Sequence, residues 1–469
     1  MERENVHVVM VPWLAFGHMI PFFELSKALA QKGITVSFIS TPRNLQRLPP
    51  TPPELAPQIN LVGFPLPSVE GLPKNAEATT DIPLKKVPYL KKAYDGLRAP
   101  FEELVAKVSP DWIVVDFAPY WATSIASKYG VPCCWFNAVS TAFTVFLGPP
   151  HSLKGLCRTT TVDELMVVPE WITFPSTIAF RRHEAQAFLQ QVLTNLHNGS
   201  GVSDWYRVQS ILEGCRVVAF RTGKEFDGDY IDLFEKLYEK SVFPLGFLPP
   251  SQAEREGNDN SWIDENKWST AFEWLDAQPL RSVVFVGFGS ECRLSIEQVH
   301  EIAYGLELSK LPFVWALRKP FETHDGLEIL PKGFEGRTER QGIICIGWAP
   351  QQRIFAHPSI GGCLFHSGWG SIIEALSHGL ALILLPFIID QGINARLLGE
   401  KKLGFEVERN EDDGSFTKVS IAKALRFVMV EEEGEPLRVK AREMKPIFGN
   451  KELSDMYLDG FANFLKNNK

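Results

Sequence analysis

The chain has 469 residues, of which 45% are hydrophobic and 22% charged, a composition typical of a soluble globular protein with two or three domains. Its net charge of −8 argues against a nucleic-acid-binding protein, because such proteins neutralise phosphates with lysine and arginine. Its seven cysteines, an odd number without a CxxC pair, indicate neither a disulfide framework nor a zinc site.

The start of the chain does not have the features of a secretory signal peptide. Its charged residues are mixed in sign, and no small-residue cleavage site follows the apolar stretch. Farther along, no run of about 20 apolar residues is present that could cross a bilayer. We therefore expect a cytoplasmic protein with reduced thiols, without a membrane span, and in the monomeric state.

The first predicted elements alternate between strands and a helix. Residues 6–11 predict a strand, 13–19 a loop, 21–32 a helix that stops at Gly33, and 34–39 a second strand. This β-loop-α-β order is typical of the start of an open parallel sheet.

Two segments interrupt this pattern. Residues 49–73 are rich in proline and predict a long excursion, and residues 151–203 mix aromatic residues, arginine and glutamine without a clean period. Insertions of this kind often build substrate pockets on α/β scaffolds. Between them, a strand at 111–116, a helix at 121–129 and a strand at 133–136 continue the sheet.

A polar segment rich in helix- and strand-breaking residues at 248–266 predicts a linker, after which a second α/β unit follows. We expect an N-terminal domain (1–247), a linker (248–268), a C-terminal domain (269–448) and a terminal segment (449–469). The elements predicted after the linker are strands at 282–286, 313–316, 342–346, 362–365 and 380–385, helices at 296–308 and from Ser371, and an amphipathic helix at 455–466.

The stretch 348–391 carries the most information about function. It begins with Trp348 in a Trp-Ala-Pro-Gln sequence, continues with His366 and small residues before a helix, and closes with Asp390 and Gln391 after an apolar strand. A helix N-terminus preceded by glycines favours phosphate, and an aromatic face can stack on a base. These are the parts needed to bind a nucleotide diphosphate sugar.

This stretch closely resembles the signature box of plant family-1 UDP-dependent glycosyltransferases. The resemblance implies an α/β fold with two Rossmann-like, doubly wound domains that face each other (GT-B type) and a C-terminal helix that packs back on the first domain. It also implies a UDP-sugar donor bound by Ser290, Trp348, Ala349, Gln351, His366, Gly368, Trp369, Gly370, Ser371, Glu374, Asp390 and Gln391.

Several of these residues have structural alternatives. Trp348 could be a core residue, Ser371 could be the N-cap of the helix, and Glu374 could be its capping-box partner rather than a ribose ligand. Gly370 departs from the family, because most members carry an asparagine there whose amide helps to bind the diphosphate or the sugar. One donor is therefore missing, and the backbone N–H of Gly370 is what remains.

His18 and Asp116 each follow a predicted strand, so both should lie at the carboxyl edge of the first sheet. A histidine can remove a proton from a hydroxyl near neutral pH, and a carboxylate can orient it. The alternatives are a structural histidine and a helix-capping aspartate. The family resemblance implies that they are the catalytic pair of a single inverting displacement. We expect a transfer without a cofactor, and without a metal because no clustered Asp-x-Asp stands near the box.

The sequence says less about the acceptor. Candidate acceptor contacts are Trp13, Phe16, Phe117, Tyr120 and Phe143, although each could instead be a core residue. The loop sequence at 13–18 resembles a subgroup that adds a sugar to a sugar already carried by a flavonoid, terpenoid or steroid. We therefore expect a small-molecule glycoside acceptor and UDP-glucose as the donor.

Other donors and acceptors stay open, namely UDP-rhamnose, UDP-xylose, UDP-galactose and a free aglycone. A nicotinamide-dependent oxidoreductase is disfavoured, because the loop after the first strand has one glycine where Gly-x-Gly-x-x-Gly is needed. A non-catalytic binding protein is disfavoured by the presence of both His18 and Asp116.

Overall fold

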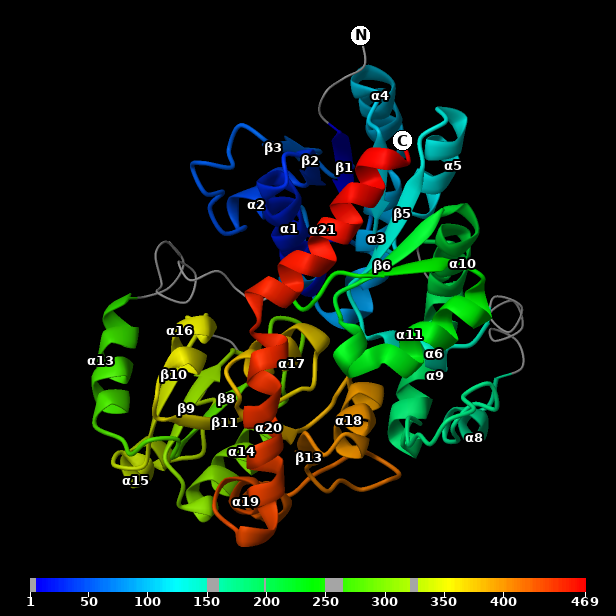
Figure 1. The fold of residues 1–469 in the computed structure, drawn as a ribbon. Coiled ribbons are helices and arrows are strands. Elements are labelled where there is room, and N and C mark those ends of the chain that lie inside the picture. Colours follow the sequence, from blue (N-terminus) through cyan, green and yellow to red (C-terminus); the bar gives the residue numbers. More distant parts are fainter. Residues whose placement is uncertain (1–5, 150–159, 198–199, 249–264, 321–327) are drawn as a thin grey trace.

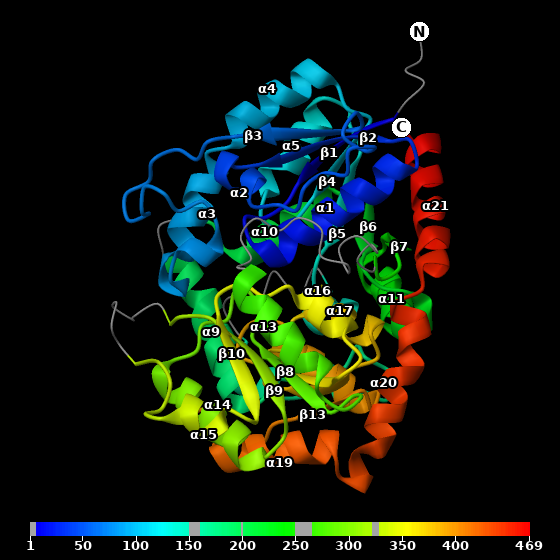
Figure 2. The same ribbon diagram turned by 90° about the vertical axis from the view of Figure 1, so that its left-hand side faces the viewer.

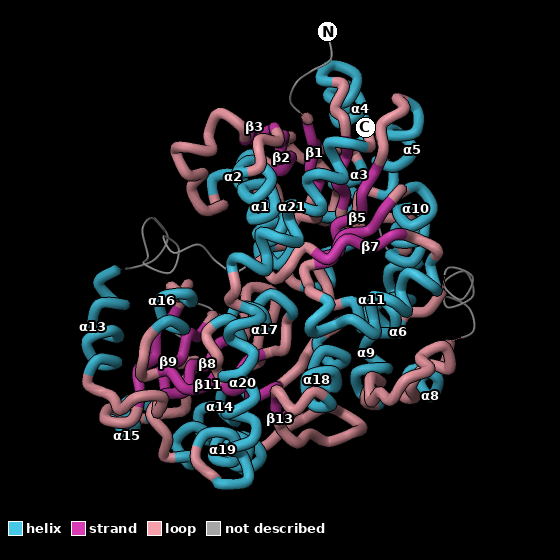
Figure 3. Tube along the Cα trace, viewed as in Figure 1, coloured by secondary structure: helices cyan, strands magenta, loops and turns pink. Residues whose placement is uncertain are grey.

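The computed structural model describes residues 6–149, 160–197, 200–248, 265–320 and 328–469. The chain forms two parallel β-sheets, each covered by helices, and the two sheets lie in separate halves of the molecule (Figure 1, Figure 3). This confirms the predicted pair of Rossmann-like units. The exact domain boundaries stay predictions.

The first sheet has seven strands in the order β3-β2-β1-β4-β5-β6-β7, and every neighbouring pair is parallel. Its order reverses between β1 and β4, which makes their carboxyl ends the switch point of the sheet. The strands are β1 (His7–Val11), β2 (Thr35–Ser40), β3 (Ile59–Gly63), β4 (Trp112–Val115), β5 (Cys133–Asn137), β6 (Val217–Phe220) and β7 (Ser241–Pro244).

The second sheet has six parallel strands in the order β10-β9-β8-β11-β12-β13, and its switch point lies between β8 and β11. The strands are β8 (Val283–Gly287), β9 (Phe313–Leu317), β10 (Gly342–Ile346), β11 (Ile360–Phe365), β12 (Ala381–Leu384) and β13 (Gly404–Glu406).

The helices that cover the first sheet and connect its strands are α1 (Phe16–Gln31), α2 (Pro42–Gln46), α3 (Val87–Asp95), α4 (Arg98–Val108), α5 (Tyr120–Lys128), α6 (Thr141–Phe146), α8 (Val162–Leu165), α9 (Arg182–His197), α10 (Asp204–Gly214) and α11 (Lys224–Tyr238). Those of the second half are α13 (Glu265–Asp276), α14 (Ile296–Ser309), α15 (Phe334–Thr338), α16 (Gln351–Ala356), α17 (Trp369–Ser377), α18 (Gln391–Glu400), α19 (Lys418–Met429) and α20 (Glu435–Phe448), followed by α21 (Lys451–Asn467). Within the described residues, none of these helices combines the length and apolar character needed to cross a membrane.

The central strands are apolar on both faces, as parallel strands between two helical layers must be. In β1, Val8 and Met10 pack into one core cluster, whereas Val9 and Val11 pack into another. The first of these clusters includes Phe22 of α1, so alternate residues of one strand hold helices on opposite faces.

The C-terminal helix returns to the first half, as predicted (Figure 2). Phe461 and Leu465 of α21 are buried in the core cluster of the first sheet, and Trp112 Nε1 of β4 donates to the Leu465 carbonyl at 3.0 Å. The preceding helix, α20, packs on α17 and β12 of the second half, and its last residue, Phe448, stacks on Phe247 of the first half with ring centroids 3.9 Å apart. The last two helices therefore tie the two halves together.

Several local predictions differ from the structure. Residues 13–19 are not one loop, because α1 already begins at Phe16, where Phe16 and Met19 bury one face of its first turn. The second helix predicted from Ser371 begins earlier, at Trp369. The predicted proline-rich excursion contains an edge strand, β3, and α13 begins inside the predicted linker, of which residues 249–264 lie outside the described chain. The strands β6, β7 and β13 were not predicted.

Candidate functional site

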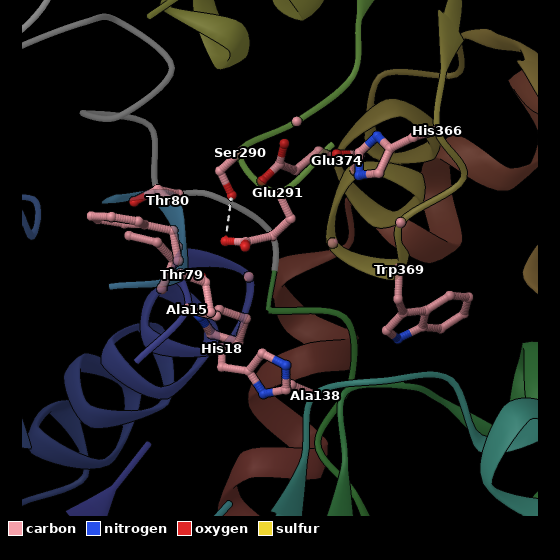
Figure 4. Close-up of a pocket in the computed structure, with 18 of the residues that line it drawn as sticks. Ala15, His18, Thr79, Thr80, Ala138, Ser290, Glu291, His366, Trp369 and Glu374 are labelled. Carbon is pink, nitrogen blue, oxygen red and sulfur yellow. Dashed lines mark hydrogen bonds between the residues drawn. The ribbon is translucent and has the colours of Figure 1, made fainter. Parts of the chain in front are cut away.

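A cavity of about 1850 Å³ lies between the two halves and is lined by residues of both sheets. Figure 4 shows His18 on one side of this space and Ser290, His366 and Glu374 on the other. The two switch points contribute directly, because His18 follows β1 and Asp116 follows β4, whereas Ser290 follows β8 and His366 follows β11. This is where α/β sheets bind ligands.

His18 and Asp116 form a hydrogen-bonded pair. The distance from His18 Nδ1 to Asp116 Oδ2 is 2.8 Å. The Asp116 side chain is 2% exposed and the His18 side chain 21%, so the imidazole reaches the cavity and the carboxylate lies behind it. With Nδ1 bound to the carboxylate, Nε2 is the ring atom left to take up a proton from a bound molecule.

The backbone fixes the orientation of Asp116. Its Oδ2 accepts from the Trp13 N–H at 2.9 Å, and its Oδ1 accepts from the Phe117 N–H at 2.7 Å. The helix after Asp116 has Pro119 as its N-cap, so Asp116 does not cap that helix. Of the two readings of this carboxylate, the geometry favours a partner for His18.

The charge around His18 favours its protonated form. Burial lowers the pKa of His18, but the Asp116 carboxylate outweighs this effect through charge and hydrogen bonding. Glu291 and Asp390 add smaller effects in the same direction, and the net pKa of His18 is raised. A histidine with a raised pKa is a stronger base once it is neutral.

On the opposite wall, the turn before α17 forms a narrow cradle. His366 is 7% exposed, burial lowers its pKa to about 4, and its Nδ1 has no hydrogen-bond partner in the described chain. A Cβ on Gly289 or on Gly368 would lie 2.5 Å from an atom of the His366 ring, so both positions need glycine. The cradle therefore places a neutral imidazole beside a helix N-terminus, which suits a phosphate.

The geometry at the start of α17 excludes one of the roles considered for Ser371 and Glu374, that of a capping box. Gly368 is the N-cap and Ser371 is the third helical residue, so the capping box considered for Ser371 and Glu374 is not formed. Instead, Glu374 Oε2 accepts from Gln351 Nε2 at 2.6 Å. Both side chains line the cavity beside Ala349 and Trp348, and Trp348 is 37% exposed, which is unusual for a core tryptophan.

Two predicted donor-site residues already have structural partners. The Trp369 indole N–H donates to the Arg221 carbonyl at 3.0 Å, across the two halves. Gln391 is 4% exposed, and its Oε1 accepts from the backbone N–H groups of Phe387 and Ile388 at 2.9 and 3.0 Å. The neighbouring Asp390 lines the cavity, and burial raises its pKa to about 6.

The acceptor candidates lie on the wall made by the first half. Four of them line the cavity, namely Trp13, Phe16, Phe117 and Phe143. Tyr120 does not line the cavity. Its ring centroid lies 5.6 Å from that of Tyr206 and 5.0 Å from the Cζ atom of the Arg207 guanidinium. We therefore withdraw Tyr120 as an acceptor contact.

Sequence reasoning missed several residues of this wall. Phe188 comes from the irregular segment 151–203, and Trp205 follows directly after that segment; both line the cavity. Lys91 is 4% exposed, and its Nζ lies 2.6 Å from Asp204 Oδ1. An ion pair between α3 and the start of α10 joins residues that are distant in sequence, and no local pattern predicts it.

No group of three or more His, Cys, Asp or Glu side chains in the described part of the chain could hold a metal ion. The walls of the cavity thus offer a base, apolar rings, a helix N-terminus and carboxylates.

Comparison with known proteins accounts for both halves. The family described as "UDP-glucoronosyl and UDP-glucosyl transferase" matches residues 236–435, and the family described as "Glycosyltransferase, N-terminal domain" matches residues 4–186. UDP-glycosyltransferase 91A1 of Arabidopsis thaliana is 43% identical over 100% of this chain and 98% of its own length. Anthocyanidin-3-O-glucoside rhamnosyltransferase of Petunia hybrida is 33% identical over 98% of this chain and 96% of its own length.

The fold also matches solved structures. The structure of Glycyrrhiza uralensis UGT73P12, complexed with glycyrrhetinic acid 3-O-monoglucuronide, superposes with a TM-score of 0.80 at 22% identity, covering 99% of this chain and 96% of that one. At this identity the match supports the two-sheet GT-B architecture and no more.

Proposed function

The chain belongs to the family of plant UDP-glycosyltransferases, and on that premise we propose that it is an inverting enzyme that transfers glucose from UDP-glucose to a sugar hydroxyl of a plant glycoside. The acceptor would be a terpenoid, steroid or flavonoid glycoside. The observation that carries the proposal is the His18–Asp116 pair, 2.8 Å apart, on the wall of the cavity that faces His366 and Glu374.

The reaction would be one displacement. His18 Nε2 removes the proton from the acceptor hydroxyl as that oxygen attacks the anomeric carbon, while Asp116 holds the Nδ1–H and stabilises the imidazolium. The bond from the anomeric carbon to the diphosphate oxygen breaks on the opposite face, so the configuration inverts. UDP leaves with the electron pair of that bond.

The negative charge that builds on the leaving diphosphate would meet the N-terminus of α17 and His366. Ser290, whose Oγ lies 3.3 Å from Glu291 Oε1, would donate to it as well. Because the chain supplies these donors, we propose that transfer needs neither a metal ion nor a cofactor. Trp348 would stack on uracil, and Glu374 would accept from the ribose hydroxyls.

Two further parts of the proposal concern the substrates. The name of the Petunia relative describes a glucoside acceptor, which supports a sugar-on-sugar reaction for this chain. The same name describes rhamnose transfer, so UDP-rhamnose is the second candidate donor. The cytoplasmic location and the monomeric state stay predictions.

A transfer assay read by mass spectrometry would test the proposal. UDP-glucose, UDP-rhamnose, UDP-xylose and UDP-galactose are each paired with an aglycone and with its monoglucoside. A hexose gain from UDP-glucose on the monoglucosides alone is expected. Transfer to the aglycones would contradict the glycoside acceptor, and a deoxyhexose gain would replace glucose by rhamnose.

A further inference from the structure

Arg221 is a buried cation at the junction of the two halves. It follows β6 directly, is 4% exposed and lines the cavity. Its Nε donates to the Phe247 carbonyl at 2.8 Å and its Nη2 to the Leu248 carbonyl at 3.1 Å. These two bonds fix the plane of the guanidinium and therefore the position of the third nitrogen, Nη1.

Nη1 of Arg221 faces the first turn of α17. It lies 3.9 Å from the position that a Cβ on Gly370 would occupy, and it is the nearest atom to that position in the described structure outside the glycine's own surroundings. Because Gly370 has no side chain, the space between its backbone and the guanidinium is left open. The Trp369 indole holds the Arg221 carbonyl at 3.0 Å and so fixes this approach from the other side.

Positive charge gathers at this place. The N-terminus of a helix carries a positive partial charge and the Arg221 guanidinium carries a full one, and the two face each other here. An anion bound between them interacts favourably with both, more strongly so because the site is buried. Two buried polar atoms just before the helix, His366 Nδ1 and Ser367 Oγ, have no partner in the described chain and could bind the same ligand.

We propose that Arg221 is a donor-binding residue that contacts the diphosphate of the UDP-sugar together with the N-terminus of α17. This inference rests on the proposed function, which supplies the diphosphate. It gives the first half of the chain, whose other site residues face the acceptor, a direct contact with the leaving group. It also places a charged donor where Gly370 lacks the asparagine amide that most members of the family carry.

The test measures the binding of UDP and of uridine by calorimetry to the wild type and to Arg221→Gln. The two ligands share the base and ribose and differ in the diphosphate. Loss of a charge-assisted hydrogen bond should weaken UDP binding about 10- to 100-fold, while uridine binding stays unchanged. Arg221→Lys keeps the charge and should retain most of the UDP affinity.

Two controls separate binding from a purely structural role. Trp369→Phe removes the indole N–H that holds the Arg221 carbonyl and so loosens the position of the guanidinium, and it should weaken UDP binding less than Arg221→Gln does and leave uridine binding unchanged. Arg337→Gln removes a cation that pairs with Glu307 away from the cavity and should change neither affinity. A thermal melt of each variant confirms that it is folded.

Each outcome bears on the inference. Equal loss of UDP and uridine affinity in Arg221→Gln, or an unchanged affinity for UDP, would overturn it. Failure of the wild type to bind UDP would instead overturn the proposed function, and this inference with it.

Discussion

Gln351 and Glu374 are joined by a hydrogen bond of 2.6 Å between Gln351 Nε2 and Glu374 Oε2, although 23 residues separate them in the chain. Gln351 begins α16 and Glu374 lies near the middle of α17, so the bond holds the start of one helix to the middle of the other on one wall of the cavity. A carboxylate held in this way is oriented before a nucleotide arrives, which reduces the entropy lost on binding.

The first prediction concerns the ribose. Glu374→Ala should weaken uridine binding about 10-fold, because a charged acceptor for the ribose hydroxyls is lost. Binding of 2′,3′-dideoxyuridine, which lacks those hydroxyls, should not change. Calorimetry with both nucleosides checks this, and Glu335→Ala, an exposed residue of α15 outside the cavity, is the control. Equal losses for both nucleosides would mean that Glu374 only supports the wall.

The second prediction concerns the base. His18→Ala should lower the turnover of glycosyl transfer by about 10²- to 10⁴-fold, the range of general-base catalysis, and leave the dissociation constant of UDP nearly unchanged. His357→Ala is a suitable control, because His357 bonds to Ser359 and Asp276 outside the cavity lining. Normal turnover in His18→Ala would contradict the assignment of the base.

The third prediction concerns pH. His18 acts as a base only when neutral and its pKa is raised, so kcat/KM should increase with pH through a midpoint above about 6.5. Asp116→Asn removes the charge that raises the pKa and leaves the burial that lowers it. The midpoint should therefore move to lower pH, and the maximal rate should fall on the order of 100-fold, because the histidine loses its orienting partner.

The pH profile needs one further variant, because the pKa of Asp390 is about 6 and its titration overlaps that of His18. Asp390→Asn removes this second titration and should leave the midpoint of His18 above its ordinary value, since Asp116 is the larger cause of the shift. A midpoint that disappears in Asp390→Asn and persists in Asp116→Asn would assign the profile to Asp390.

The meeting of His18 and Asp116 was predictable because both follow strands of one parallel sheet, whose carboxyl ends share an edge. The sequence did not predict that His18 lies in the first turn of α1. That turn depends on the burial of Phe16, and Pro21 inside the helix weakens the helical pattern. The bond between the Trp369 indole and the Arg221 carbonyl joins residues 148 positions apart, and no local pattern encodes such a contact.

The strands of the fold also divide into those that the sequence predicts and those that it does not. Central strands such as β1 are apolar on both faces and stand out in the sequence, whereas the edge strand β3 has the burial pattern of one buried residue followed by largely exposed ones. A short edge strand within a proline-rich segment carries too few apolar positions to be recognised. Its pairing with β2, from Val36 with Ile59 to Ser40 with Gly63, appears only in three dimensions.

The last prediction concerns Asn394, which connects the proposed sugar-binding carboxylate to the acceptor half. Asn394 Nδ2 donates to Asp390 Oδ2 at 2.8 Å and to the Ser367 carbonyl at 3.0 Å, and its Oδ1 accepts from Ser140 Oγ at 2.6 Å. Asn394 is fully buried, so these bonds fix Asp390 with little freedom to adjust.

Asn394→Leu has a similar size and removes all three bonds. It should raise the KM for the UDP-sugar, because Asp390 loses its orientation, while the dissociation constant of UDP, which lacks the sugar, should stay the same. The free energy of unfolding should fall by about 1–3 kcal/mol, because the partners of Asn394 stay buried without hydrogen bonds. Ser140→Ala removes the bond between the halves and the N-cap bond of α6 from the Phe143 N–H, leaves the bond from Asn394 to Asp390 in place, and should reduce stability without the same change in KM. If UDP and the UDP-sugar lose affinity equally in Asn394→Leu, then Asn394 supports the whole turn before α17, through Ser367, rather than the contact with the sugar.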